Sequence, residues 1–137
     1  MGDAQAVIDT NVFVSGMIQP FGAPGQLLDA LLNRRLKIAY DDRLLLEYRE
    51  VLMRPRFSFD PKRIEEVFNS MLFQNRVSAH PWALSPSPDP EDTMFLEVAA
   101  AADAPLVSGN LKHFPPECRG PVTVMLPAEF LASLVSR

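Results

Sequence analysis

The stretch AVIDTNVFVSG, residues 6–16, places one acid, Asp9, between two apolar runs. Two further acids, Glu47 and Asp92, stand where a folded chain can bring their carboxylates to Asp9. Two carboxylates about 4 Å apart repel each other by roughly 4 kcal/mol at an effective dielectric constant of about 20, so such a cluster must bind protons or cations. Ligand sets made of oxygen atoms suit Mg²⁺ or Mn²⁺, which polarise phosphate groups and activate water. We therefore interpret Asp9 as a metal ligand.

Helical spacing separates the acids that can face such a site from those that face solvent. In the helix predicted over 42–54, Glu47 falls on the flank of the apolar stripe, whereas Glu50 points away from it. Asp92 falls in the first turn of a helix predicted over 90–103, where a negative charge is favourable. Glu47 and Asp92 are thus the acids that we expect beside Asp9.

Polar residues also end the strand predicted over 105–110. In open parallel sheets, ligands bind beyond the carboxyl ends of the strands, so Ser108 and Asn110 are predicted to share one edge of the sheet with Asp9. Asn110 can offer a carbonyl oxygen to a metal ion, but it brings no charge. The expected metal ligands are therefore Asp9, Glu47, Asp92 and Asn110, with possible support from Asn11, Ser108 and Asp89.

Each of these side chains also has an ordinary structural explanation when it is taken alone. These explanations are a strand-end turn or helix cap for Asp9, a solvated helix position for Glu47, a first-turn acid for Asp92, an N-cap for Asp89 and a turn for Asn110. The functional interpretation depends on their occurring together, in one order and at one predicted place.

The elements that must position these residues alternate along the chain. Strands separated by helices predict an α/β fold, a three-layer α/β/α sandwich around a central, mainly parallel sheet. Asp41 or Asp42 is predicted to cap the second helix, and Asp60 followed by Pro61 to open the third. The predicted strands are 6–8, 37–40, 105–110 and 122–126, and the predicted helices are 24–36, 42–54, 61–72, 90–103 and one from Pro127 with Phe130, Leu131, Leu134 and Val135 facing inward.

The totals indicate one domain spanning residues 1–137. The proline-rich stretch 80–92 is predicted to be a loop, and it is too short for a domain linker. Cys118 is the single cysteine, and we see no signal peptide or membrane-spanning run, so we expect a cytoplasmic protein. The net charge of −4 gives no reason to expect nucleic-acid binding, although an uneven charge distribution or bound metal ions can still allow it.

Basic residues gather in two short groups that could hold RNA phosphates near the acids. Solvated helix ends and loops are the alternative for each of them. The two groups are Arg34, Arg35 and Lys37, and Arg54, Arg56, Lys62 and Arg63.

Four blocks of the sequence together resemble the PIN-domain nuclease family, particularly the VapC-like toxins of toxin–antitoxin systems. VIDTNVFVSG is similar to the opening motif with Asp9 as the first acid, and DRLLLEYREVLMRPRF to the second block with Glu47 as the central acid. DPEDTMFLEVAAAADAPLVSGN resembles the third block with Asp92 as the third acid, and PAEFLASL the closing helix. The family usually has a further acid where this chain has Asn110, and Asp89 or Glu91 could compensate for it.

The resemblance implies a Mg²⁺-dependent ribonuclease in which Asp9, Glu47 and Asp92 are catalytic, with RNA as substrate. It also implies a homodimer and inhibition by a cognate antitoxin protein. One alternative is a weakened PIN-fold module that binds RNA or an antitoxin without efficient cleavage, which Asn110 motivates. Another is a Mg²⁺-dependent phosphatase with Asp9 as nucleophile, but that chemistry expects an acid where Asn11 stands.

Overall fold

A parallel sheet of five strands forms the centre of the molecule, in the order β3-β2-β1-β4-β5. The computed structural model describes residues 4–72, 75–79 and 89–135. The strands are β1 (Ala4–Ile8), β2 (Leu36–Tyr40), β3 (Asn75–Arg76), β4 (Leu106–Val107) and β5 (Val124–Met125). The four predicted strands are all present, although β4 is much shorter than predicted. The edge strand β3 was not predicted, because two residues are too few to show a pattern.

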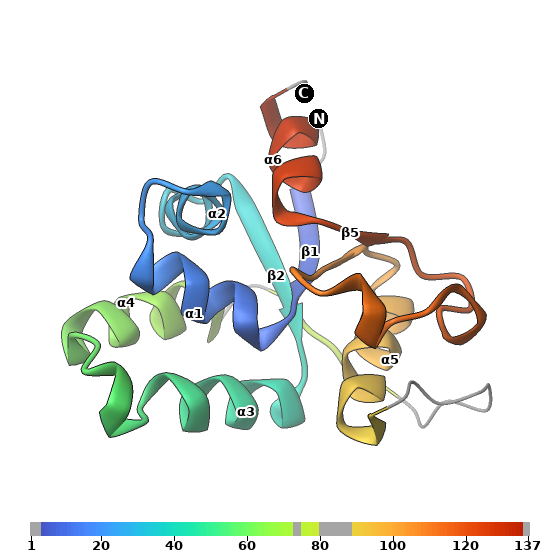
Figure 1. Cartoon of the computed structure of the whole chain (residues 1–137), viewed down its shortest axis with the longest axis horizontal. Coiled ribbons are helices and arrows are strands. Elements are labelled where there is room, and N and C mark those ends of the chain that lie inside the picture. The colour runs from blue at the N-terminus through green and yellow to red at the C-terminus, as the bar shows by residue number, and fades with distance from the viewer. Residues whose placement is uncertain (1–3, 73–74, 80–88, 136–137) are drawn as a thin grey trace.

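Helices cover both faces of this sheet. In Figure 1, α1, α2 and α4 lie on one side of β1 and β2, and α5 lies on the other. The described helices are α1 (Thr10–Ile18), α2 (Ala23–Leu32), α3 (Asp42–Leu52), α4 (Pro61–Leu72), α5 (Thr93–Ala102) and α6 (Pro127–Val135). Short 3₁₀ turns are η1 (Pro55–Phe57), η2 (Pro90–Asp92), η3 (Leu111–His113) and η4 (Pro116–Cys118). This arrangement confirms the predicted α/β sandwich, and none of these helices has the length and apolarity needed to cross a membrane.

Capping side chains begin two helices where the sequence predicts. Asp41 Oδ1 accepts a hydrogen bond from the Leu44 backbone N–H at 3.1 Å, and Asp60 Oδ1 accepts one from the Lys62 N–H at 3.0 Å. Both bonds satisfy amide groups that have no partner within the helix. They fix where α3 and α4 start, and therefore which face of each helix turns inward.

Helix α1 was not predicted, and it begins directly after Asp9. The backbone of Asp9 is extended, with φ −64° and ψ 141°, and the chain turns helical at the next residue. The run 12–14 is apolar and rich in valine, so its local pattern suits a buried strand as well as a helix. Packing of Phe13, which is fully buried, decides for the helix.

Three further details differ from the sequence predictions. Helix α2 ends at Leu32 rather than at Leu36, because Arg34 adopts a left-handed conformation with φ 61° and the chain then enters β2. Val135 is 73% exposed, so it does not face inward with Phe130 and Leu134. Of the loop predicted over 80–92, residues 80–88 lie outside the described residues.

Candidate active site

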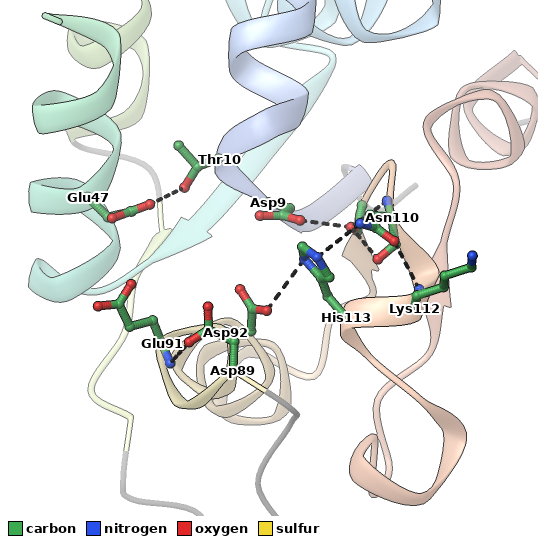
Figure 2. Close-up of polar contacts among 10 residues, drawn as sticks. Asp9, Thr10, Glu47, Asp89, Glu91, Asp92, Asn110, Lys112 and His113 are labelled. Carbon is green, nitrogen blue, oxygen red and sulfur yellow. Dashed lines mark hydrogen bonds and ion pairs between the residues drawn. The ribbon is translucent and has the colours of Figure 1, made fainter.

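Five carboxylates line one cleft at the carboxyl edge of the sheet. Asp9 follows β1, Glu47 comes from α3, and Asp89, Glu91 and Asp92 come from the segment that leads into α5. The cleft has a volume of about 260 Å³. Figure 2 shows these side chains arranged around a common opening. The structure therefore brings together the three acids predicted to be catalytic, and it places beside them Asp89 and Glu91, which the sequence suggested could compensate for Asn110.

A cluster of aromatic side chains joins the three helices around the cleft, α1, α3 and α5. The ring of Tyr48 on α3 lies 4.6 Å from that of Phe13 on α1 and 6.4 Å from that of Phe95 on α5, centroid to centroid. The Tyr48 hydroxyl donates a hydrogen bond to the carbonyl of Ile8, the last residue of β1. Because Tyr48 follows Glu47 and Ile8 precedes Asp9, this buried contact fixes the two acidic segments relative to each other.

Asp9 is the most buried of the five acids, at 5% exposed. The Ser108 hydroxyl donates a hydrogen bond of 2.8 Å to Asp9 Oδ2, while the Asp9 side chain forms no capping bond to α1. Burial raises the pKa of Asp9 above its ordinary value. The Ser108 bond, the nearby His113 and the backbone N–H groups of Thr10 and Asn11 oppose that rise only in part. The structure thus places Ser108 beside Asp9, at the edge of the sheet where the sequence predicts it.

Glu47 is half-buried and is linked to the segment that follows Asp9. The Thr10 hydroxyl donates a hydrogen bond of 3.2 Å to Glu47 Oε2. Glu50, one turn further along α3, is 73% exposed and pairs with Arg54 at 3.6 Å. The helical spacing therefore distinguished the inward acid from the outward one.

Asp92 has a carboxylate oxygen without a hydrogen-bond partner. Its side chain is 14% exposed, and Oδ2 is buried with no hydrogen bond to any described residue. Nδ1 of His113 lies 3.5 Å from that oxygen, which is longer than a normal hydrogen bond. Burial first, and the charge of Asp9 second, raise the pKa of Asp92 to about 6. An orphaned, partly desolvated oxygen of this kind is suited to a cation or a proton.

Asn110 does not line the cleft. Its Oδ1 accepts a hydrogen bond from the Lys112 backbone N–H at 3.2 Å, and its Nδ2 lies 3.0 Å from Nε2 of His113. The bond to Lys112 assigns the amide orientation, so the Nδ2 group of Asn110 faces Nε2 of His113. His113 therefore stands between Asn110 and Asp92, as Figure 2 shows. That Asn110 itself binds a metal ion stays a prediction.

His113 is a site residue that the sequence analysis missed. It lines the cleft with the acids, and its charge lowers the pKa of both Asp9 and Asp92. The sequence offers one weak signal, since His113 stands three residues after Asn110 and a single 3₁₀ turn brings the two side chains together. Arg54 and Arg56, which belong to a basic group suggested to hold RNA phosphates near the acids, also line the cleft, and so does Phe57, which the sequence analysis did not single out.

The oxygen ligands that the cleft offers fit a hard divalent cation, although their side chains do not converge on one point. Asp9, Glu47 and Asp92 offer carboxylate oxygens, and the unpartnered Oδ2 of Asp92 is free to coordinate. Among residues 4–72, 75–79 and 89–135, no three His, Cys, Asp or Glu side chains converge closely enough to hold one ion as they stand. Coordination would require movement of these side chains.

Comparison with known proteins identifies the family. Residues 5–112, which include all five cleft acids, match the PIN domain. The chain belongs to the PIN domain family. It is also similar to the uncharacterized protein MJ1680 of Methanocaldococcus jannaschii, with 25% identity over 109 residues that cover 77% of this chain and 70% of the relative. No solved structure matches the chain.

Membership of the PIN domain family gives the cleft a chemical context. PIN domains are generally nucleases, and PIN-domain nucleases generally use divalent metal ions. The acidic cleft at the carboxyl edge of the sheet is the natural place for such chemistry in a parallel α/β fold.

Proposed function

We propose that this PIN domain is a Mg²⁺- or Mn²⁺-dependent endoribonuclease. The observation that carries the proposal is the cleft that gathers Asp9, Glu47 and Asp92, with the buried Oδ2 of Asp92 unpartnered. Burial raises the pKa of Asp9, and burial together with the charge of Asp9 raises the pKa of Asp92 to about 6. A protein retains such an arrangement at a cost in stability when the carboxylates serve a bound ion and its substrate.

The chain's own residues hold the reactive groups in place. Ser108 orients Asp9 through Oδ2, and Thr10 orients Glu47 through Oε2. A bound Mg²⁺ would polarise the scissile phosphate and activate a water molecule. Asp9, Glu47 and Asp92 would hold that ion, and the two hydroxyl contacts would keep Asp9 and Glu47 from turning out of the cleft.

We further propose that the protein is a cytoplasmic toxin, similar to VapC, that acts as a homodimer and is inhibited by a cognate antitoxin. This part of the proposal is supported by the order of the motif blocks, which extends from the first acid at Asp9 to the closing helix α6. Co-expression with the protein encoded beside it would test the antitoxin, through rescue of growth and co-purification of a complex.

Cleavage of labelled RNA in the presence of Mg²⁺, with EDTA as the stop, tests the nuclease. Attack by water rather than by the neighbouring 2′-hydroxyl should leave 5′-phosphate and 3′-hydroxyl ends. Cleavage that persists in EDTA, or products with 2′,3′-cyclic phosphates, would refute the mechanism. Thermal melting with and without Mg²⁺ gives an independent readout, because ion binding should raise the melting temperature of the wild-type protein.

A matched pair of variants on α3 separates the site from the surface. Glu47→Gln should lose cleavage and most of the stabilisation by Mg²⁺, whereas Glu50→Gln, on the exposed face of the same helix, should keep both. Asp9→Asn should likewise abolish cleavage. Wild-type cleavage by Asp9→Asn or Glu47→Gln would overturn the assignment of these residues.

A binding module that does not cleave efficiently is the second candidate. It is favoured by Asn110, which is neutral and whose amide oxygen is held by the backbone N–H of Lys112. Tight binding of RNA or of an antitoxin, without cleavage at any Mg²⁺ or Mn²⁺ concentration, would support this candidate over the nuclease.

A further inference from the structure

Three flat side chains form a stack beside the acidic cleft, and two of them line it. The rings of Phe57 and Phe59 are stacked, with centroids 5.0 Å apart and planes 4° from parallel. The guanidinium carbon of Arg56 lies 4.9 Å from the centroid of the Phe57 ring. These three residues belong to η1 and the turn after it, between α3 and α4. Phe59 packs against the hydrophobic core, whereas Phe57 is partly exposed and Arg56 is exposed.

Hydrogen bonds hold the backbone that carries this stack in a defined turn. Ser58 is left-handed, with φ 51°, and its hydroxyl donates a hydrogen bond of 3.2 Å to the Pro55 carbonyl. The backbone N–H groups of Phe57 and Ser58 each donate to a carbonyl three residues earlier, at 3.1 Å. Proline restricts the chain further at the first position of η1. The turn therefore fixes the order in which Phe59, Phe57 and Arg56 stack.

The stack also lies between two clefts, because its members line both of them. Arg56 and Phe57 line the acidic cleft, whereas Phe59 lines a neighbouring cleft of about 430 Å³ between α3 and α4. Arg54 lines both of them. A flexible strand that leaves the acidic cleft on this side would pass directly over the stacked side chains.

Arg56 is available for a ligand. Arg54 is paired with Glu50 at 3.6 Å, and the Arg49 guanidinium lies 5.0 Å from the centroid of the Phe68 ring. Within the part of the chain that the structure describes, no carboxylate forms an ion pair with Arg56, although acids line the same cleft. Its guanidinium carbon lies over the Phe57 ring, and the residue is exposed.

We propose that the Arg56–Phe57 pair is a stacking platform for one unpaired base of a single-stranded RNA bound in the cleft. This inference rests on the proposed function and names the residues that receive a base of the RNA. Bases stack on aromatic rings and on guanidinium planes with little sequence preference, and Arg56 can also neutralise a backbone phosphate beside the repelling carboxylates. A base within a duplex already has stacked neighbours and cannot reach the platform. The platform therefore selects unpaired RNA.

Binding of fluorescein-labelled RNA tests the platform without depending on cleavage. All proteins carry Asp9→Asn, and fluorescence anisotropy compares an intact 8-nucleotide strand with the same strand made fully abasic. Phe57→Leu keeps an apolar side chain but removes the aromatic face, and Arg56→Lys keeps the charge but removes the plane. The matched control is Arg76→Lys, at an exposed arginine on β3 that lies outside both clefts.

Phe57→Leu and Arg56→Lys should each weaken binding of the intact strand about fivefold or more, the low end for one base–aromatic stack. Binding of the abasic strand should change by less than about twofold, and the preference for single strands over duplex should fall. Equal losses for intact and abasic RNA, or no loss for either variant, would overturn the platform. Because Arg56 is exposed, Arg56→Lys keeps the test decisive even if Phe57→Leu fails to fold.

The outcome also separates the platform from the nuclease. Base-dependent binding without cleavage by the wild-type protein at any metal concentration would refute the proposed function and leave the platform standing. The wild-type protein could instead cleave RNA in a metal-dependent way while all variants lose the same affinity when the bases are removed. That result would refute the platform and leave the nuclease standing.

Discussion

The cleft without a metal ion carries an electrostatic cost at Asp92, and Asp92→Asn should relieve it. Burial and the charge of Asp9 raise the pKa of Asp92 to about 6, compared with 3.8 for an exposed aspartate. Because the folded-state pKa is the higher one, the folded protein binds the proton more tightly than the unfolded chain does. Wild-type stability should therefore fall as the pH rises between these two values, and the full penalty should remain above pH 6.

The size of the effect follows from the two pKa values. A difference of about two units corresponds to about 3 kcal/mol in the free energy of unfolding. The Asp92 side chain is 14% exposed, so water screens part of the interaction, and we expect roughly 1–2 kcal/mol. Asparagine has nearly the same shape, and the substitution breaks no hydrogen bond of Oδ2 to a described residue. For a domain of this size the gain corresponds to a rise of roughly 3–8 °C in melting temperature.

Urea unfolding in EDTA at pH 7.5 and pH 3.5 measures this effect. Asp92→Asn should be more stable than the wild type at pH 7.5, and the difference should nearly vanish at pH 3.5, where the wild-type carboxyl is protonated in both states. Saturating Mg²⁺ should stabilise the wild type more than the variant. Glu50→Gln, at an exposed acid, should show no such pH dependence. If Asp92→Asn is no more stable than the wild type at pH 7.5, the reasoning about a strained acidic cleft is wrong.

Three further substitutions probe the metal site and the frame that holds it. Asn110→Asp should raise Mg²⁺ affinity severalfold in a calorimetric titration, because it adds one negative charge beside the cleft. Tyr48→Phe should lower the free energy of unfolding by about 1–3 kcal/mol in urea titrations, because the buried carbonyl of Ile8 loses its donor. Gly25→Ala should lower the melting temperature, at a cost of about 2 kcal/mol or more, since a Cβ there would lie 2.2 Å from the Pro20 carbonyl oxygen.

Each of these predictions has an outcome that contradicts it. Unchanged Mg²⁺ affinity in Asn110→Asp would mean that His113 shields position 110 from the bound ion. Wild-type stability of Tyr48→Phe would show that the carbonyl of Ile8 finds another donor. Gly109→Ala is the control for Gly25→Ala, because a Cβ at Gly109 meets no atom within 4 Å, and both glycines giving equal stability would refute the steric argument.

The sequence alone determined the fold class and the three central acids. Apolar runs separated by amphipathic helices predict a parallel sheet, because buried strands and one-sided helices leave different periodicities. Such a sheet brings strand ends to one edge, which is enough to place Asp9 and Ser108 together. The helical period likewise distinguished Glu47 from Glu50, because side-chain direction along a helix is fixed by 3.6 residues per turn. These features depend on local geometry, and local geometry is visible in a sequence.

Tertiary packing decided the remaining features. Helix α1 begins where an apolar run could equally have continued as strand, and burial of Phe13 against Tyr48 settles the choice. Nδ1 of His113 lies 3.5 Å from Asp92, which another element carries, while Arg56 and Phe57 reach the cleft because α3 ends beside it. Their neighbours across the cleft lie dozens of residues away along the chain. No periodic signal in the sequence encodes such contacts, because they depend on how separate elements pack together.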